Sequence, residues 1–268
     1  MEKILTVISL GVGVQSSTMA LMSAKGVLPK VDCAIFADTG YEPKKVYEYL
    51  EWIKTQLPFP IYIVSKGNIK NDMIGSIDNG TRFPTAPFFT RNAETGKKGM
   101  LMRQCTNDYK IQPIRKKIRE LCNVDYKKHF PKDKFVEQWL GISTDEIIRM
   151  KQARDKYINN IYPLIDLKMS RSNCLKWMAD NGYPLPEKSA CICCPYHDDN
   201  YWQEMKDKRP DEFQDAVDFD LKIRTGSRKI HDHLFLHRSC KPLSEVEFKK
   251  KKDQLNMFND ECEGLCGV

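Results

Sequence analysis

The stretch CICCP places Cys191 and Cys194 at C-x-x-C spacing, the clearest chemical feature of the sequence. Two thiolates three residues apart can bind one metal ion or one metal cluster. Cys105 opens a basic stretch, and the fold could bring it to the same crevice. The sequence therefore predicts a metal centre on these three thiols, with unligated thiols as the alternative. The candidates for a fourth ligand are Cys193, Cys240 and Cys174.

A glycine- and serine-rich turn, ISLGVGVQSST at residues 8–18, has the setting of a phosphate-binding loop. An apolar run precedes it and a helical pattern follows, so backbone N–H groups and a helix N-terminus would face an anion. The turn is neither a Walker loop nor the dinucleotide fingerprint, because it lacks Gly-Lys-Ser/Thr and a third glycine. A purely structural turn is the alternative. The candidate phosphate-binding residues are Ser9, Gly11, Gly13, Gln15, Ser16 and Ser17.

A third polar group, Asp38-Thr39-Gly40, closes the apolar run VDCAIFA. In open α/β sheets, ligands bind at the carboxyl ends of the strands, so these three residues are candidates for nucleotide binding. The alternative for Asp38 is that it caps the following helix.

The elements that must position these groups alternate between strand and helix, which predicts right-handed βαβ units and a parallel sheet. Strands are predicted at 4–9, 31–37, 60–64 and 135–143, with helices at 16–26, 43–57, 108–122 and 144–156. Residues 65–104 show little periodicity and are interpreted as a long loop or insertion. After 161–165 the chain is predicted to be helical and cysteine-rich, in the stretches 170–182, 189–207 and 210–226. The predicted fold class is α/β: a Rossmann-like parallel sheet flanked by helices, with a helical, cysteine-rich C-terminal region. We expect a nucleotide-binding domain at 1–165 and a second region at 166–268 that ends in a flexible tail.

The composition fits a globular protein, with 268 residues, 41% hydrophobic residues and a net charge of +7. The N-terminal apolar segment is too short for a signal peptide and no stretch reaches transmembrane length, so we expect a cytoplasmic protein with no membrane partner. Disulfides are then a poor account of ten cysteines. Cys33 and Cys122 are interpreted as small buried hydrophobes.

The basic excess suits an anionic partner. The basic runs at 115–117 and 249–252, with Arg119, could contact a phosphate backbone, although a solvated helix face is the more common explanation. The aromatic residues Trp177, Tyr201 and Trp202 keep nucleic-acid binding among the hypotheses.

A resemblance joins these features. GVGVQSS followed by ADTGYEPKKVYEYLEWIK resembles the adenine-nucleotide α-hydrolase superfamily of PP-loop ATP pyrophosphatases, in the branch that contains the phosphoadenylylsulfate (PAPS) reductases. RQCTNDYKIQPIRKKI, LGISTDEIIRM and ECEGLCG continue the match in order across most of the chain. The middle and C-terminal stretches are most similar to a branch called PAPS reductase-like, which phages and bacteria often carry.

The motif residues of this chain are mixed. Gln15 is similar to the reductases, whereas Ser16 and Ser17 are similar to the ATP-cleaving enzymes. Ser143 stands where the family usually has arginine, and Arg149 is retained. The resemblance adds Gly141 and Arg149 to the predicted nucleotide-binding residues.

The resemblance implies an adenine nucleotide, either ATP with Mg²⁺ or PAPS or adenylylsulfate. Cys105, Cys191 and Cys194 resemble the three-cysteine [4Fe–4S] site of iron–sulfur tRNA thiolation enzymes, with Zn²⁺ as the alternative cofactor. Three thiolates leave one iron open for a fourth ligand or for a sulfur atom. Cys262 and Cys266 in the tail are candidates for sulfur relay or catalysis, together with Asp38.

Three functions are carried forward. The first is an iron–sulfur, ATP-dependent adenylating sulfurtransferase acting on tRNA or DNA. The second is a sulfonucleotide reductase, and the third is a non-catalytic iron–sulfur protein that binds a nucleotide or nucleic acid. The expected partners are the adenine nucleotide, a nucleic acid, a sulfur donor or thioredoxin-like reductant, and a second copy of the chain in a homodimer. His231, His233 and His237 are a weaker candidate for a separate metal site.

Overall fold

The computed structural model describes residues 1–81, 83–226, 230 and 232–248 of the chain. Its centre is a five-stranded sheet in the order β3-β2-β1-β6-β7, and every paired strand is parallel to its neighbour. The strands are β1 (Glu2–Ser9), β2 (Cys33–Asp38), β3 (Ile61–Ser65), β6 (Lys134–Leu140) and β7 (Ile158–Ile161). The structure thereby confirms the predicted α/β fold class.

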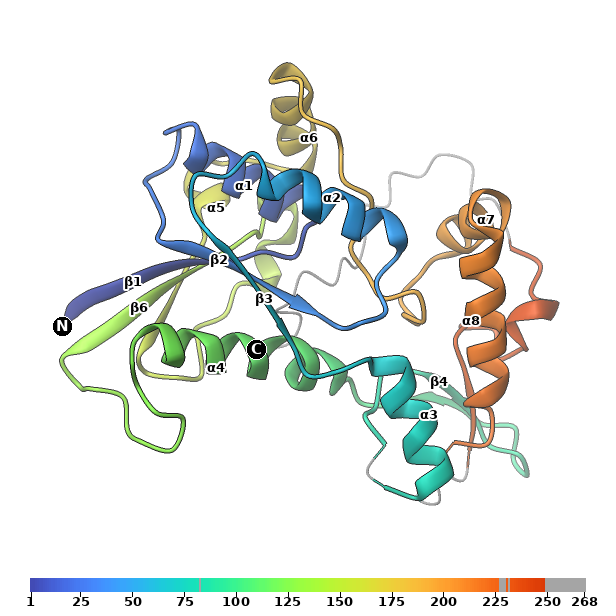
Figure 1. The fold of residues 1–268 in the computed structure, drawn as a ribbon. Helices are drawn as coiled ribbons and strands as arrows, with labels where there is room; N and C mark the ends of the chain where they lie inside the picture. The colour runs from blue at the N-terminus through green and yellow to red at the C-terminus, as the bar shows by residue number, and fades with distance from the viewer. Residues whose placement is uncertain (82, 227–229, 231, 249–268) are drawn as a thin grey trace.

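Helices cover both faces of the sheet (Figure 1). One face carries α1 (Val14–Ala24), α2 (Lys44–Lys54), α5 (Pro163–Asp166) and α6 (Arg171–Asp180), and the other carries α4 (Gln112–Leu121). Alternating residues of β1 explain the two layers, since Ile8 packs toward α1 and Val7 packs toward α4. Cys33 is buried and Cys122 half-buried in the α4 layer, as predicted for small hydrophobes.

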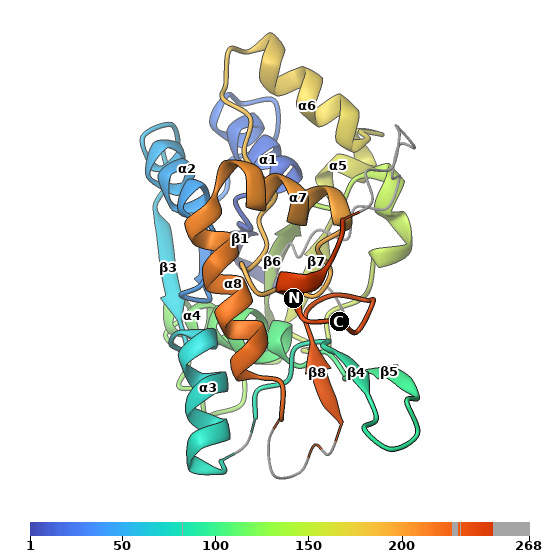
Figure 2. The same ribbon diagram turned by 90° about the vertical axis from the view of Figure 1, so that its right-hand side faces the viewer.

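A third cluster lies beyond the carboxyl end of β2, around Phe88, Trp202 and Phe219. It joins α3 (Ile69–Asn79), α7 (Asp199–Lys208) and α8 (Pro210–Lys222) to a small antiparallel sheet (Figure 2). That sheet has the order β5-β4-β8, with β4 (Phe89–Arg91), β5 (Lys98–Met100) and β8 (His233–Phe235).

The segment 65–104, interpreted as a long loop or insertion, contains α3, β4 and β5, so the loop alternative is wrong for much of it. Asn68 accepts a hydrogen bond from Asn71 N–H (3.0 Å) and begins α3, which ends at Gly80 with φ +64°. Only Ile69, Met73 and Ser76 of this helix are buried. So short an apolar stripe, interrupted by Gly75, does not stand out as helical periodicity.

The predicted helix at 144–156 is replaced by a 3₁₀ helix, Thr144–Arg149, followed by an irregular loop. Glu146 has non-helical backbone angles (φ −119°, ψ 20°) in the middle of this stretch. Its side chain accepts a hydrogen bond from Gln15, and Tyr162 holds the backbone of Lys151. Contacts with distant residues therefore override the local helix propensity.

The cysteine-rich stretch 189–207 is helical only from Asp199, because CICCP forms turns instead. Residues after 166 contribute to two clusters, since Cys174 and Met178 of α6 pack with α1 while α7 and α8 build the third cluster. In the described ranges, no helix has both the length and the apolar character needed to cross a membrane.

Candidate functional site

The glycine-rich turn lies where the strand order reverses, between the carboxyl ends of β1 and β6. The segments after these strands touch at Gly141. A Cβ added to Gly141 would lie 2.7 Å from Ser16 N and 2.8 Å from Ser16 Cα. Gly141 was predicted to bind nucleotide. The structure gives another reason for glycine at this position, which is the close approach of the α1 backbone.

The turn itself is bent at an unexpected residue. Val12, not a glycine, has a left-handed φ of +62°, a conformation that is strained for a β-branched side chain. Gly13 is the N-cap of α1, and its carbonyl accepts from Ser17 N–H (3.0 Å). The N–H groups of Val14, Gln15 and Ser16 are therefore the ones that the helix leaves for an anion. Ser9 is buried at the end of β1.

Gln15 and Arg149, both predicted to bind nucleotide, meet at Glu146, which was not among the predicted site residues. The Gln15 amide donates to Glu146 Oε2 (3.2 Å) and to Ser143 Oγ (3.4 Å), and Arg149 pairs with Glu146. Ser143 is fully buried and accepts the hydrogen bond from Gln15. These contacts tie the 3₁₀ helix after β6 to the first turn of α1.

The Asp38–Gly40 turn is shaped by its own polar groups. Asp38 Oδ1 accepts from Gly40 N–H (2.7 Å) and Tyr47 O–H (2.8 Å). Gly40 has φ +69°, and a Cβ there would lie 2.9 Å from Asn68 Cα, so this position requires glycine. Burial and the bond to Asp38 raise the pKa of Tyr47. Asp38 thus has a positioning role in the turn, whereas its catalytic role stays a prediction.

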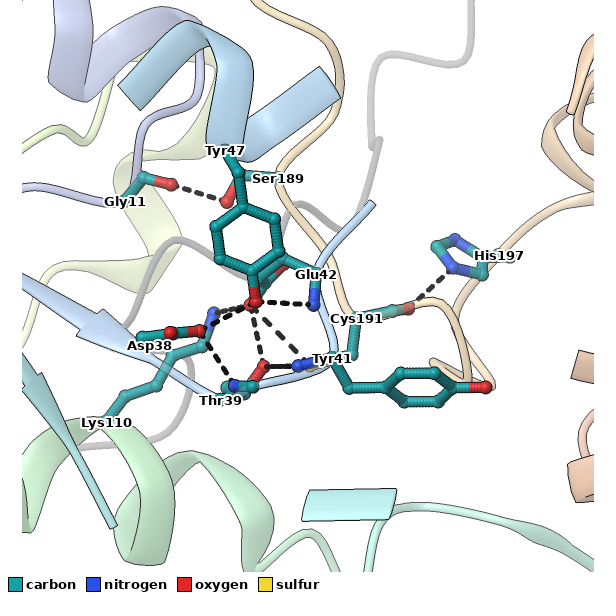
Figure 3. A network of polar contacts seen from close by, with 11 residues as sticks. Gly11, Asp38, Thr39, Tyr41, Glu42, Tyr47, Lys110, Ser189, Cys191 and His197 are labelled. Carbon is teal, nitrogen blue, oxygen red and sulfur yellow. Dashed lines mark hydrogen bonds and ion pairs between the residues drawn. The ribbon is translucent and has the colours of Figure 1, made fainter. Parts of the chain in front are cut away.

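Glu42, two residues beyond Gly40, links this turn to the cysteines (Figure 3). Its side chain is fully buried, and Oε1 lies 3.1 Å from Thr39 Oγ1 and 3.4 Å from Lys110 Nζ. Cys191 Sγ lies 3.7 Å from the same oxygen and 3.2 Å from Thr39 Oγ1. Glu42 and Lys110 were missed by the sequence analysis because their pairing joins separate parts of the chain.

Four of the cysteines line one pocket, which we call the thiol pocket. Cys105, Cys191 and Cys194, the predicted ligands, lie there with Cys193, one of the predicted fourth ligands. Burial, with Cys194 and Cys105 nearby, raises the pKa of the Cys193 thiol. The remaining lining residues are Thr39, Ile69, Ala86, Pro87, Arg103, Thr106, Lys110, Pro195 and Tyr196.

The segment that carries C-x-x-C also reaches the glycine-rich turn. Ser189 Oγ donates to Gly11 O, and Cys191 O accepts from His197 Nε2 (2.9 Å) (Figure 3). Burial lowers the pKa of His197, which is therefore neutral with its proton on Nε2. The sequence analysis selected neither Ser189 nor His197, although both flank the CICCP motif.

The other candidate ligands lie elsewhere. Cys174 is buried in the α1–α6 layer, and Cys240 Sγ donates to Thr90 O (3.6 Å), so neither lines the thiol pocket. Both ring nitrogens of His237 are engaged, by Ser239 and Asp199. Cys262, Cys266 and His231 lie outside the described residues. Within the described ranges, no group of three or more His, Cys, Asp or Glu side chains could hold a metal ion as arranged.

The basic run 115–117 and the aromatic residues named with it are largely engaged in the fold. Arg115 pairs with Asp155 (2.7 Å), and Arg119 is buried and donates to backbone carbonyls. Trp202 is fully buried, so it cannot stack on a base. The run 249–252 lies outside the described residues.

No family model matches the chain, and no curated protein does. Among solved structures, the chain is similar to the phosphate complex of phosphoadenylyl-sulfate (PAPS) reductase from Candida auris, at 13% sequence identity and a TM-score of 0.43. The match covers 70% of this chain and 76% of that one.

Proposed function

We propose that this protein is an adenine-nucleotide-dependent sulfurtransferase that acts on a nucleic acid. The observation that carries the proposal is the contact between Thr39 Oγ1 and Cys191 Sγ (3.2 Å). The contact supports the proposal because Thr39 directly follows β2, and α/β sheets bind nucleotides at the carboxyl ends of their strands. A nucleotide-activated group and a thiol-bound centre would therefore meet there.

The thiol pocket fits a [4Fe–4S] cluster by its donor set. Cys105, Cys191 and Cys194 would bind it, in an apolar pocket that also holds the side chains of Arg103 and Lys110. A cluster binds each thiolate to a different iron, so its ligands need not converge on one point as they do around a single ion. When bound through three thiolates, such a cluster offers one iron that can hold sulfide. Zn²⁺ remains the alternative to be decided by metal analysis.

The chain's own residues would bind and orient the nucleotide. Backbone N–H groups at residues 14–16 face the phosphates of ATP, which enters with Mg²⁺. An oxygen of the acceptor attacks the α-phosphorus, and pyrophosphate leaves. Sulfide from a donor then attacks the carbon that bears the adenylated oxygen, the carbon–oxygen bond breaks and AMP leaves.

Cys262 and Cys266 are the proposed relay residues when the donor is a persulfide. One thiolate takes the donor's outer sulfur as the donor thiolate leaves, and the persulfide formed attacks the same carbon and displaces AMP. The second thiolate then forms the Cys262–Cys266 disulfide and releases the thiolated acceptor, and a thioredoxin-like reductant restores the two thiols.

The test uses the full chain, purified without oxygen, with ATP labelled in its terminal phosphates. Pyrophosphate release that requires tRNA or DNA is the expected result. Cys194→Ser should abolish the visible absorbance and lower the iron content, whereas Cys33→Ala, in the buried face of β2, should retain both.

Two other results would replace the proposal. Release of sulfite from PAPS with thioredoxin would identify a sulfonucleotide reductase. Tight nucleic-acid binding with neither product would identify a non-catalytic binding protein. Zinc in a colourless protein would overturn the cluster assignment alone.

A further inference from the structure

A groove of about 520 Å³ lies along β7. This strand is at the edge of the sheet, next to β6 (Figure 2). The loop at 150–157 forms one wall, and β7 with Tyr162 forms the other. The residues that line it are Met150, Lys151, Gln152, Ala153, Asp155, Lys156, Ile158, Asn159, Asn160 and Tyr162. We call it the basic groove. It shares no lining residue with the thiol pocket.

Hydrogen bonds and one ion pair fix the loop at 150–157, which forms one wall of the basic groove. Lys151 N–H donates to Tyr162 Oη (2.9 Å), and Tyr162 O–H donates back to Lys151 O (2.5 Å). Asn160 Nδ2 donates to the same carbonyl (2.9 Å), and Asp155 pairs with Arg115 of α4 (2.7 Å). These contacts fix the backbone of the loop and leave the ammonium groups of Lys151 and Lys156 in solvent.

The groove lies within the most basic part of the chain. Residues 115–156 contain twelve Lys and Arg against seven Asp and Glu, so they supply most of the net charge of +7. The neighbouring loop adjoins the groove through Phe130, whose ring stacks on Tyr157 with centroids 4.1 Å apart. The exposed cations of the two loops are Lys127, Lys128, Lys132, Lys151, Arg154 and Lys156.

The groove is connected along the chain to the candidate site, since its first lining residue, Met150, follows Arg149 directly. The 3₁₀ helix Thr144–Arg149 connects them, and Glu146 in that helix accepts the Gln15 hydrogen bond (3.2 Å). A polymer bound along the loop at 150–157 would therefore lie next to the segment that contacts the glycine-rich turn.

We propose that the basic groove binds the phosphodiester backbone of a nucleic acid and directs one nucleotide to the glycine-rich turn. Clustered exposed lysines provide phosphate contacts without sequence readout, and the amides of Gln152, Asn159 and Asn160 add hydrogen-bonding groups. The inference rests on the proposed function for the identity of the acceptor, and it adds where that acceptor docks.

The experiment measures fluorescence anisotropy of fluorescein-labelled single-stranded RNA and of a labelled tRNA pool, with the full chain and without ATP. The double variant Lys151→Glu/Lys156→Glu should weaken binding at least tenfold. Because each lost phosphate contact removes about 0.7 from the slope of log affinity against log salt for single strands, that slope should fall by about 1.4. The control Lys30→Glu/Lys97→Glu changes net charge equally, at exposed residues away from the groove, and should bind like the wild type.

Circular dichroism of each variant shows whether weaker RNA binding comes from the changed groove residues or from unfolding of the protein. Equal binding by the groove variant and the wild type would overturn the groove but leave the sulfur chemistry standing. Groove-dependent RNA binding without nucleic-acid-dependent pyrophosphate release would overturn the proposed function but keep the groove. Groove-dependent binding to phosphatidylserine vesicles, with none to RNA, would overturn the nucleic-acid assignment.

Discussion

The thiol pocket and the basic groove lie on opposite sides of β1 in the sheet, and they differ in whether their lysine side chains are buried or exposed. The side chain of Lys110, which lines the thiol pocket, is 6% exposed, and that of its partner Glu42 is fully buried. In the groove Lys151 and Lys156 are exposed to solvent. Buried charges must be paired to be tolerated, whereas solvated charges stay available to a polyanion. Lysine is therefore buried in an ion pair on one side, whereas on the other its ammonium group is exposed and available to the polyanion that we propose.

The largest expected effect is on the buried pair. Lys110→Met leaves Glu42 without its ammonium partner, and breaking a buried ion pair typically costs about 3–5 kcal/mol of unfolding free energy. Urea unfolding of the variant measures the loss. Adding Glu42→Gln to the variant should recover part of it, because the uncompensated charge is removed.

The matched change on the groove side is Lys156→Met, which should alter the unfolding free energy by no more than about 0.5 kcal/mol. Similar losses of unfolding free energy for Lys110→Met and Lys156→Met would contradict the difference in burial between the thiol pocket and the basic groove.

The next largest effect is expected at Gly141, where the segment after β6 contacts the first turn of α1. Gly141→Ala places a methyl group 2.7 Å from Ser16 N, and overpacking of this kind typically costs about 1–3 kcal/mol. Nucleotide binding should weaken as well, because the first turn of α1 must shift. The control is Gly75→Ala in α3, where the added Cβ meets no atom within 4 Å. That variant should be about 0.5–1 kcal/mol more stable than the wild type. A Gly141→Ala protein as stable as the wild type would contradict the close contact.

A smaller effect should follow from Tyr162→Phe. The variant loses both hydrogen bonds to the backbone of Lys151, worth about 1 kcal/mol each or less. Amide hydrogen exchange should then become faster in the loop at 150–157 and stay unchanged in the thiol pocket. Uniform exchange changes in both regions would show that the groove wall is not an independent unit.

The smallest effect concerns thiol reactivity, which distinguishes the buried Cys33 from the partly exposed Cys194 of the thiol pocket. Burial raises the pKa of Cys33 to about 12, so at pH 8 this thiol is almost wholly protonated and should resist iodoacetamide. Raising the pH toward 10 increases its thiolate fraction but leaves it small, because the pH is still below that pKa. The partly exposed Cys194 should react in the cluster-free chain and be protected once iron and sulfide are restored. Mass spectrometry of the alkylated peptides gives both results, and labelling of Cys33 before Cys194 would contradict the burial pattern.

Much of the fold could be predicted from local patterns. The buried strand ending at Ser9 and the amphipathic helix around Val46 and Ile53 each bury residues at the spacing of their own element. The helix α3 was missed because its apolar stripe is short. The helix expected at 144–156 does not form because Gln15, far away in the chain, and Tyr162, which follows β7, bond to that segment.

The sequence by itself determined the alternation of strand and helix in the first part of the chain, the parallel sheet, the glycine-rich turn and the C-x-x-C motif. Those features are local, since each depends on residue types and spacing within one short stretch. Only the tertiary structure decided that Cys105 joins the motif, that Glu42 pairs with Lys110, and that the basic run of α4 is engaged while the loop beyond it is exposed. Which charges are buried, paired or free depends on which distant segments pack together, and spacing along the chain does not encode that.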